Sequence, residues 1–245
     1  MASRRAVRLG VLACGLAVPA TLMSAPTVAG AAPSAPAAKA TVSVLHAIPA
    51  GLGADIVDVY AGSALLVEDL RPGMLTTITL PGGTYTLTVR PDGTSPGSAV
   101  SPLTGPRTRV PSGANVTVAA HLTPSGRPAM TAFTNDTTTV GRGKGRLTVR
   151  HVAAAPPVDV RTAGSTLLTG LRNARQANAG LNAGTYRVDA VLAGTRKGVL
   201  PPTTVTIRNS PGTQDMGTNT ILYVWGATAD GALAHVVQNV RIDLR

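Results

Sequence analysis

The sequence repeats its own short motifs about 100 residues apart. Three motifs return in the same order: Ala61–Leu66 as Ala163–Leu168, Val57–Val59 as Val158–Val160, and Gly83–Tyr85 as Gly184–Tyr186. The last two pairs are each separated by 101 positions. This spacing is too long for a solenoid repeat and fits one small domain. The sequence therefore predicts two tandem copies of a single domain.

Apolar and polar residues alternate along both copies with a period of two. Tyr85, Leu87 and Val89 alternate with threonines; Val42 and Val44 alternate with Thr41 and Ser43; Val116 and Val118 alternate with Asn115 and Thr117. This pattern predicts strands with one buried and one solvated face. Turn-forming groups such as Pro81–Gly83 and Pro111–Gly113 separate the runs. About seven or eight strands per copy predict an all-β fold of two immunoglobulin-like antiparallel β-sandwiches.

The first 31 residues have the pattern of a cleavable signal peptide. Arg4, Arg5 and Arg8 precede the apolar stretch Leu9–Met23, and Ala29–Ala31 forms a small-x-small cleavage site. The protein is therefore expected to be secreted, and extracellular or associated with the cell wall. The single cysteine, Cys14, lies inside the signal, so the mature chain is expected to fold without disulfides. No later run is apolar and long enough to predict a transmembrane segment.

Composition suggests where the domains begin and end. Residues 32–40 are rich in alanine and proline and predict an extended spacer. Residues 41–136 are the first predicted sandwich, and residues 146–245 are the second. Between them, residues 137–145 combine threonines, glycines and basic side chains, which predicts a flexible linker.

The charge of the chain is concentrated in the second copy. The formal net charge is +11. Residues 40–136 hold five basic and six acidic side chains, whereas residues 145–245 hold eleven and five. A basic field attracts polyanions and is screened within about 8–10 Å at ordinary salt. The candidate polyanion contacts are Arg142, Lys144, Arg146, Arg161, Arg172, Arg175, Arg187, Arg196 and Lys197. The expected partner is an anionic cell-envelope polymer or lipid headgroup.

Two histidines occupy equivalent places in the copies. His46 shares strand parity with Val42 and Val44, so its side chain is expected to face inward, and His151 is expected to do the same. A buried imidazole at a strand end usually bonds a backbone carbonyl and fixes the next loop. Asp58 and Asp159 lie between valines and are expected on the opposite face, which argues against a His–Asp pair. The alternative is a metal-dependent or catalytic centre at His46 and His151.

The sequence offers few other residues that could form a binding or catalytic site. Glu68 and Asp69 could form half of a calcium site, but surface carboxylates in a loop are the commoner explanation. Gly141, Gly143 and Gly145 could grip a phosphate together with the basic side chains between them, but a linker is the simpler interpretation. The sequence predicts no catalytic, cofactor-binding or metal-binding residues, and no cofactor.

The few aromatic residues are expected to be structural. Tyr85 and Tyr186 recur at the start of a strand with inward parity, as in corner tyrosines whose hydroxyl bonds a loop. Trp225 shares parity with Tyr223 and is expected in the core. Modules that bind sugars or single-stranded nucleic acid depend on exposed aromatic platforms. Specific nucleic-acid recognition is therefore not expected.

The order of these motifs resembles a known family. A β run ending in histidine, a proline-containing loop, Val-Asp-Val and a later Gly-x-Tyr are similar to the DUF4397 domain of bacterial secreted and surface proteins. The resemblance rests on Val44–Pro49 with Val57–Tyr60, and again on Val149–Ala153 with Pro157–Val160. The second copy has Arg161 where the first has Tyr60. The resemblance implies fold and location, and the family name itself records an unknown function.

These observations favour a noncatalytic, exported protein that acts as a binding, adhesive or structural module of the cell envelope. Two other functions stay open. One is a small hydrolase or metal-dependent enzyme centred on His46 and His151. The other is a spacer that only displays another component and binds no ligand itself.

Overall fold

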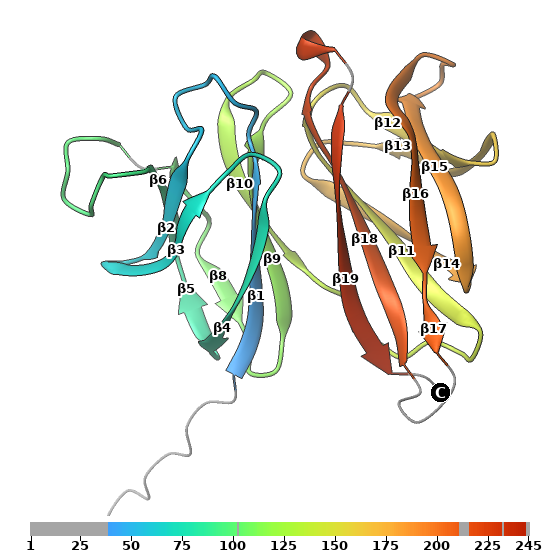
Figure 1. Ribbon diagram of the computed structural model, residues 1–245, viewed down its shortest axis with the longest axis horizontal. Coiled ribbons are helices and arrows are strands. Elements are labelled where there is room, and N and C mark those ends of the chain that lie inside the picture. Colours follow the sequence, from blue (N-terminus) through green and yellow to red (C-terminus); the bar gives the residue numbers. More distant parts are fainter. Residues whose placement is uncertain (1–38, 102, 211–215, 232, 244–245) are drawn as a thin grey trace, which may run out of the picture. The chain divides into compact units, whose positions relative to one another are not determined.

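The computed structural model describes residues 39–101, 103–210, 216–231 and 233–243, so the predicted signal 1–31 and most of the spacer 32–40 lie outside it. The first strand already begins at Lys39 (Figure 1). The strands of the first half are β1 (Lys39–Ala47), β2 (Val57–Ala61), β3 (Ala64–Leu70), β4 (Leu75–Pro81), β5 (Gly83–Tyr85), β6 (Leu87–Pro91), β7 (Leu103–Thr104), β8 (Thr108–Val110), β9 (Asn115–Leu122) and β10 (Pro128–Thr134).

The second half is equally rich in strands. They are β11 (Lys144–Ala154), β12 (Val158–Thr162), β13 (Ser165–Leu171), β14 (Arg175–Asn182), β15 (Gly184–Leu192), β16 (Gly198–Ile207), β17 (Asn209–Ser210), β18 (Met216–Ala227) and β19 (Ala234–Asp243). Apart from the 3-10 turn η1 (Thr228–Asp230), every element of the described residues is a strand. In this part of the chain no helix is long and apolar enough to cross a membrane.

The strand order of the first half recurs in the second. The first half has one sheet in the order β10-β9-β1-β4 and another in the order β3-β2-β6-β7, with β5 and β8 paired beside them. The second half has β14-β11-β18, to which β17 and β19 are added, and β13-β12-β15-β16. The prediction of an all-β sandwich fold is confirmed.

In each half one pair of neighbouring strands is parallel, although the sequence predicted antiparallel sandwiches. β1 pairs with β9 in parallel, and β11 pairs with β18 in parallel. A parallel pair needs a long connection between its two strands. Both pairs meet that condition, because each joins the first strand of its half to a strand close to the end of that half.

Each half has its own hydrophobic core. Val42, Val44, Val57, Val59 and Val89 belong to the core of the first half. In the same way, the core of the second half contains Leu147, Val149, Val158, Val160 and Val188. The period-two pattern read from the sequence corresponds to these inward-facing residues.

A third apolar cluster joins the two halves. The first half contributes Leu45, Ala47, Ala119 and Phe133, and the second contributes Val152, Ile221, Tyr223 and Val240. These residues lie on β1, β9 and β10 of the first half and on β11, β18 and β19 of the second. Ser43 and Thr117, expected on a solvated face, are therefore fully buried. The solvated-face prediction is wrong for these strands, because the other half of the chain covers them.

The predicted linker 137–145 is tied to its neighbours by hydrogen bonds, and β11 begins inside it at Lys144. The Ala183 N–H donates to Gly143 O at 2.8 Å, and the Asn209 side chain donates to Lys144 O at 2.5 Å. Arg146 forms an ion pair with Asp136 at 3.2 Å. Strand pairing therefore extends into the segment that composition marked as flexible.

Gly73, in the turn between β3 and β4, lies against Trp225 of the second half. Its φ is +80°, and a Cβ atom added there would lie 3.0 Å from the indole carbon Cζ2. Trp225, expected in a core, is partly buried against the cluster that joins the halves. From the sequence alone, Gly73 is an ordinary turn glycine. The contact with Trp225 shows that this position also leaves little room for a side chain.

Gly73→Ala is expected to lower the free energy of unfolding more than Gly62→Ala. Both glycines have positive φ, +80° and +62°, but no atom lies within 4 Å of a Cβ at Gly62. Gly62→Ala should cost about 1–2 kcal/mol from backbone strain alone. Gly73→Ala should cost about 1 kcal/mol more, because the new methyl overpacks against Trp225. Chemical denaturation followed by tryptophan fluorescence measures both, and equal losses would contradict the contact.

Candidate functional site

The two repeated histidines make the same pair of hydrogen bonds in the two halves. His46 lies at the end of β1, and its Nε2 is 2.7 Å from Ala54 O. His151 lies on β11, and its Nε2 is 3.0 Å from Pro156 O. The other ring nitrogen, Nδ1, accepts a backbone N–H two residues on, from Ile48 at 3.4 Å or from Ala153 at 3.3 Å.

These bonds require one protonation state. A carbonyl oxygen can only accept, so Nε2 carries the proton; Nδ1 accepts an N–H, so it carries none. Both side chains are fully buried, and burial lowers the pKa of His46 and of His151. Each neutral imidazole thus fixes the loop that follows its strand, and both of its ring nitrogens are hydrogen-bonded to backbone atoms.

A third buried histidine was not singled out by the sequence. His121, on β9, donates from Nδ1 to Leu122 O at 2.9 Å, and its Nε2 lies 2.9 Å from Thr131 Oγ1. Burial lowers its pKa, and its charge would also oppose protonation of His151. The repeated motifs do not include this histidine, so they give no sign of it.

The two repeated aspartates have different surroundings. Asp159 accepts the Gly194 N–H at 2.9 Å and the Gly170 N–H at 2.7 Å. These two backbone donors lower its pKa. In the first half, Asp58 Oδ1 accepts the Asp69 N–H at 3.2 Å. Neither aspartate is a hydrogen-bond partner of the repeated histidines, whose ring nitrogens are bonded to backbone atoms.

Three carboxylates of the first half converge at one end of a sheet. Oxygen atoms of Asp58, Asp69 and Asp92 lie within 4.8 Å of one another. Carboxylate oxygens are ligands that calcium accepts, so this group could hold a cation. Asp69 was considered for such a role beside Glu68, but the structure brings Asp69 together with Asp58 and Asp92. Asp92 was missed because it follows β6, a strand that neighbours β2 only in the folded sheet.

The repeated tyrosines close the turns that precede them. Tyr85 donates its hydroxyl to Pro81 O at 2.7 Å, and Tyr186 donates to Asn182 O at 3.0 Å. Both acceptors lie four residues earlier in the chain, and both rings pack partly against the core of their own half. The equivalent bonds stabilise the equivalent turns.

The basic residues proposed as polyanion contacts fall into two groups. Arg146 and Arg161 are paired with carboxylates: Arg161 makes two hydrogen bonds to Asp189, at 2.8 and 2.9 Å, which raise its pKa. The others are exposed: Arg142, Lys144, Arg172, Arg175, Arg187, Arg196 and Lys197.

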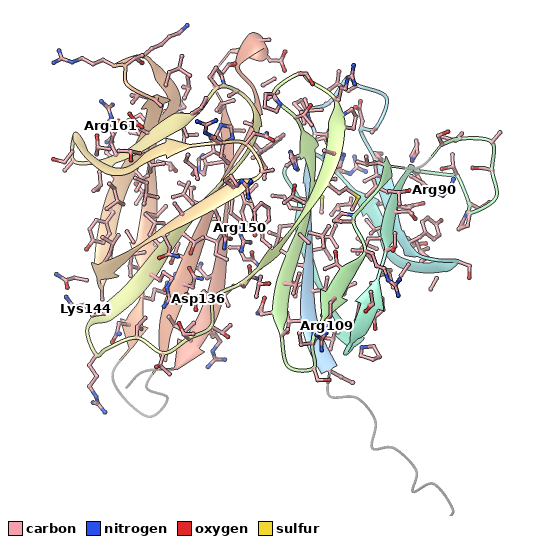
Figure 2. The ribbon with its side chains drawn as sticks, turned by 180° about the vertical axis from the view of Figure 1, so that it is seen from behind. Arg90, Arg109, Asp136, Lys144, Arg150 and Arg161 are labelled. Atoms are coloured by element: carbon pink, nitrogen blue, oxygen red, sulfur yellow. The ribbon has the colours of Figure 1, made fainter. Side chains whose placement is uncertain are left out.

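The exposed basic residues do not form one patch. Lys144 pairs with Asn182, next to the start of β15, whereas Arg196 and Lys197 lie beyond the other end of that strand. Nine residues of strand separate the two positions, which corresponds to roughly 25–30 Å. Figure 2 shows Lys144 and Arg161 at different ends of the second half.

The residues that could have gripped a phosphate at Gly141–Gly145 are engaged within the protein. The Lys144 N–H donates to Gly141 O at 3.0 Å, and the Lys144 ammonium donates to Asn182 at 2.5 Å. Gly145 is buried against Ile207. The segment is a tight turn that leads into β11.

The most unusual buried group is Arg150, which sequence reasoning missed. This β11 side chain is fully buried, and Figure 2 shows it between the strands of the two halves. Its guanidinium donates to Gln176 Oε1 at 2.9 Å, Tyr223 Oη at 2.6 Å and Asn135 Oδ1 at 2.7 Å. It also lies over the Phe133 ring, 4.6 Å from the centroid.

The acceptors around Arg150 are neutral. An amide oxygen satisfies the N–H donors without adding a second buried charge, and the faces of Phe133 and Tyr223 attract the cation. Burial lowers the pKa of Arg150 and raises that of Tyr223. The guanidinium stays protonated, because arginine is not deprotonated in proteins.

The hydrogen bonds continue across both halves. Tyr223 donates to Gln238 Oε1 at 2.6 Å, and the Gln238 amide donates to Ser43 Oγ at 2.9 Å. Thr117 also donates to Gln238 Oε1, at 3.1 Å. We call Arg150, Asn135, Tyr223, Gln238, Thr117 and Ser43 the interface network. It connects β19 to β1 and β9, and it fixes one arrangement of the two halves.

The described residues thus define an all-β protein of two sandwiches joined by a buried polar interface. Residues 40–161 match the family model DUF4397, a domain of unknown function. The matched range runs past the first sandwich into β12 and includes Arg150. No curated protein matches the chain.

Among solved structures, the chain is similar to the Bacillus anthracis TIE protein, with 12% sequence identity and a TM-score of 0.24. That match covers 80% of this chain and 34% of the other, so the chain spans about a third of the length of that protein.

Protein stability is expected to fall as the pH drops from 7 to 5. The folded-state pKa of His46, His121 and His151 is lowered, so the unfolded chain binds protons first as the pH falls below about 6.5. The contribution of the histidines to the free energy of unfolding is fully present above this value. Below it, the free energy of unfolding decreases by at most about 1.4 kcal/mol per pH unit for each histidine.

The variant His151→Gln should be less stable at pH 7.5, but its stability should fall less steeply between pH 6.5 and 5. Urea denaturation at several pH values measures both quantities. His235→Gln alters an exposed histidine of β19 and should reproduce the wild-type profile. An identical slope for His151→Gln and the wild type would contradict the assignment of a neutral buried imidazole.

Arg150→Met is expected to lower the free energy of unfolding by about 2–4 kcal/mol. Methionine fills much of the space, but it leaves the acceptors of Asn135, Gln176 and Tyr223 without their donor. Arg175→Met, at an exposed position on β14, should change stability by less than about 0.5 kcal/mol. Equal or higher stability of Arg150→Met would mean that desolvation of the guanidinium outweighs its hydrogen bonds.

Proposed function

We propose that the chain carries two tandem DUF4397 domains and is an exported, noncatalytic protein of the cell envelope. In this proposal the first half and the interface network provide a rigid body, and the second half binds an anionic polymer or lipid headgroup. The observation that carries the proposal is the exposed basic side chains of a half that holds eleven basic and five acidic residues.

The repeated histidines support a noncatalytic role. A general base needs a free ring nitrogen that can accept a proton. In His46 and His151 both nitrogens hold backbone groups, and burial disfavours the protonated form. The observed bonds therefore favour the structural role of these imidazoles over the enzymatic alternative.

The exposed face of one sheet supports the binding role. In β15, Val188 and Ala190 face the core, so Arg187 lies on the outer face of the sheet. Arg196 and Lys197 follow at the turn into β16. Together these three side chains offer exposed positive charge on one sheet and its turn, where a flexible polyanion can contact them without entering a cavity.

The location of the protein is proposed from sequence. The predicted signal 1–31 lies outside the described residues, so its support is the pattern of Arg4, Arg5 and Arg8 before Leu9–Met23. The DUF4397 match over residues 40–161 is compatible with such a role and names no ligand.

The mature protein is expected to bind poly(glycerol phosphate) or phosphatidylglycerol vesicles, with affinity that falls as salt rises. The triple variant Arg187→Gln, Arg196→Gln, Lys197→Gln should lose most of this binding. Cosedimentation and biolayer interferometry between 50 and 500 mM NaCl, about a threefold change in Debye length, measure the effect.

A matched triple variant of the first half, Arg107→Gln, Arg109→Gln, Arg127→Gln, changes the total charge equally at exposed positions. It should bind nearly as the wild type does. Equal losses in the two triple variants would show that only the overall charge matters. Absence of binding in the wild type at low salt would refute the binding role and favour a spacer.

A further inference from the structure

One sheet of the second half ends at a long edge strand, β19. It is ten residues long, and among the described residues its only strand partner is β18. Figure 1 shows β19 in dark red at one side of its sheet, followed by β18, β11 and β14. In an antiparallel pair every second residue directs its N–H and C=O away from the partner strand. β19 therefore presents a row of backbone donors and acceptors that no other described strand pairs with.

This edge lacks the features that normally protect an edge strand. Natural edge strands are short, bent by bulges, or interrupted by charged side chains or proline. β16, at the edge of the other sheet, contains Pro201 and Pro202. The pairing of β19 with β18 has no register shift, and its central residues, Val236–Val240, include no charge and no proline. Nothing in the sequence of β19 thus opposes the addition of another strand.

A polar groove runs along the same strand. Its volume is about 450 Å³, within the range of ligand sites. One wall is β19 from Val237 to Arg241, and the rest of the lining comes from the first half: Thr41, Ser43, Leu75, Thr77 and Asn115. Apart from Arg241, these side chains are uncharged. The groove therefore lies at the boundary between the two halves and offers hydroxyl and amide groups.

The first half forms the floor of this groove. Gln238 of β19 bonds Ser43 of β1 and Thr117 of β9, so β19 lies over these two strands. β4 is the next strand after β1 in the sheet, and the hydroxyl oxygens of Thr77 on β4 and Ser43 are 2.9 Å apart on the same face. Thr77 is nevertheless exposed. The second half thus leaves this part of β4 uncovered, and one strand added beside β19 would cover it.

The other face of β19 has an apolar side chain in water. Val237 pairs with Leu222 of the second core, so its side chain lies on the face away from Gln238. It is 38% exposed and belongs to the small set of large exposed hydrophobic side chains in the described residues. Successive side chains of a strand point to opposite faces. A strand added here would therefore place alternate side chains beside Val237 and over Thr77.

We propose that β19 binds an extended, uncharged segment of a partner protein in which threonine and valine alternate. The backbone of the segment pairs with the free edge of β19 and supplies the affinity, and its alternate side chains supply the selectivity. The groove continues the interface between the halves, since Ser43 and Gln238 belong to its lining and to the interface network. This binding is independent of the polyanion contacts proposed above, because Arg187, Arg196 and Lys197 lie outside the groove lining.

The blocked peptide acetyl-Thr-Val-Thr-Ser-Thr-Val-Thr-amide tests the proposal with the mature protein, by isothermal titration. It is expected to bind saturably with one site per chain. Two isomers carry N-methyl groups on alternate residues, a different set in each, and keep the same side chains. A strand added to β19 uses only one of its own edges for hydrogen bonds. One isomer should therefore bind at least tenfold more weakly, and the other should bind as the parent peptide does.

Two variants place a charge in the groove from opposite sides. Val237→Lys on β19 should weaken binding of the parent peptide at least tenfold, and Val100→Lys, at an exposed valine outside the lining, should bind as the wild type does. Thr77→Lys on the floor should also weaken binding at least tenfold, whereas Thr104→Lys, at an exposed threonine of β7, should not. Thermal unfolding and far-UV circular dichroism establish that each variant is folded.

Three results would overturn the proposal: no saturable binding by the wild type, equal binding of the two N-methyl isomers, or wild-type binding by either Val237→Lys or Thr77→Lys. Light scattering without peptide tests the other possible occupant, a second copy of the chain. The wild type is expected to be a monomer. A wild-type dimer that Val237→Lys converts to a monomer would show that β19 pairs with another copy, and this result would also overturn the proposal.

Discussion

The guanidinium of Arg150 is the group on which the arrangement of this molecule depends. It is fully buried between the halves, and its donors go to Asn135, Gln176 and Tyr223 while its plane lies over Phe133. A buried charge satisfied only by neutral groups tolerates little displacement, because each lost bond leaves a desolvated donor. With apolar contacts alone, the two sandwiches could slide against each other. The interface network instead holds them in one relative position.

Within each sandwich the neutral imidazoles have a similar but local role. His46 and His151 bond the loop that follows the first strand and also the backbone two residues further on. The halves differ in charge: residues 40–136 hold five basic and six acidic side chains, whereas residues 145–245 hold eleven and five. Two halves with the same strand order and equivalent interior hydrogen bonds can thus carry different charge.

Much of the fold could be predicted because the alternation along β1, β6 and β9 is local and regular. The inward parity of His46 and the turn-closing position of Tyr85 follow from that same periodicity. The site was harder to predict, because Asp92 meets Asp58 only through the pairing of β2 with β6. Arg150 looked like one more basic residue, since nothing in its neighbourhood in the sequence indicates that Phe133 and Tyr223 enclose it.

The amino-acid sequence by itself determined the strands, the repeated turns and the uneven charge, because these depend on residues close together in the chain. Only the tertiary structure decided which outer faces stay in water. Ser43 and Thr117 have the pattern of solvated residues, yet they are buried because Gln238, far along the chain, bonds both. A period-two pattern shows that a strand has two faces; the contacts made by the rest of the molecule determine whether the polar face meets water or another sheet.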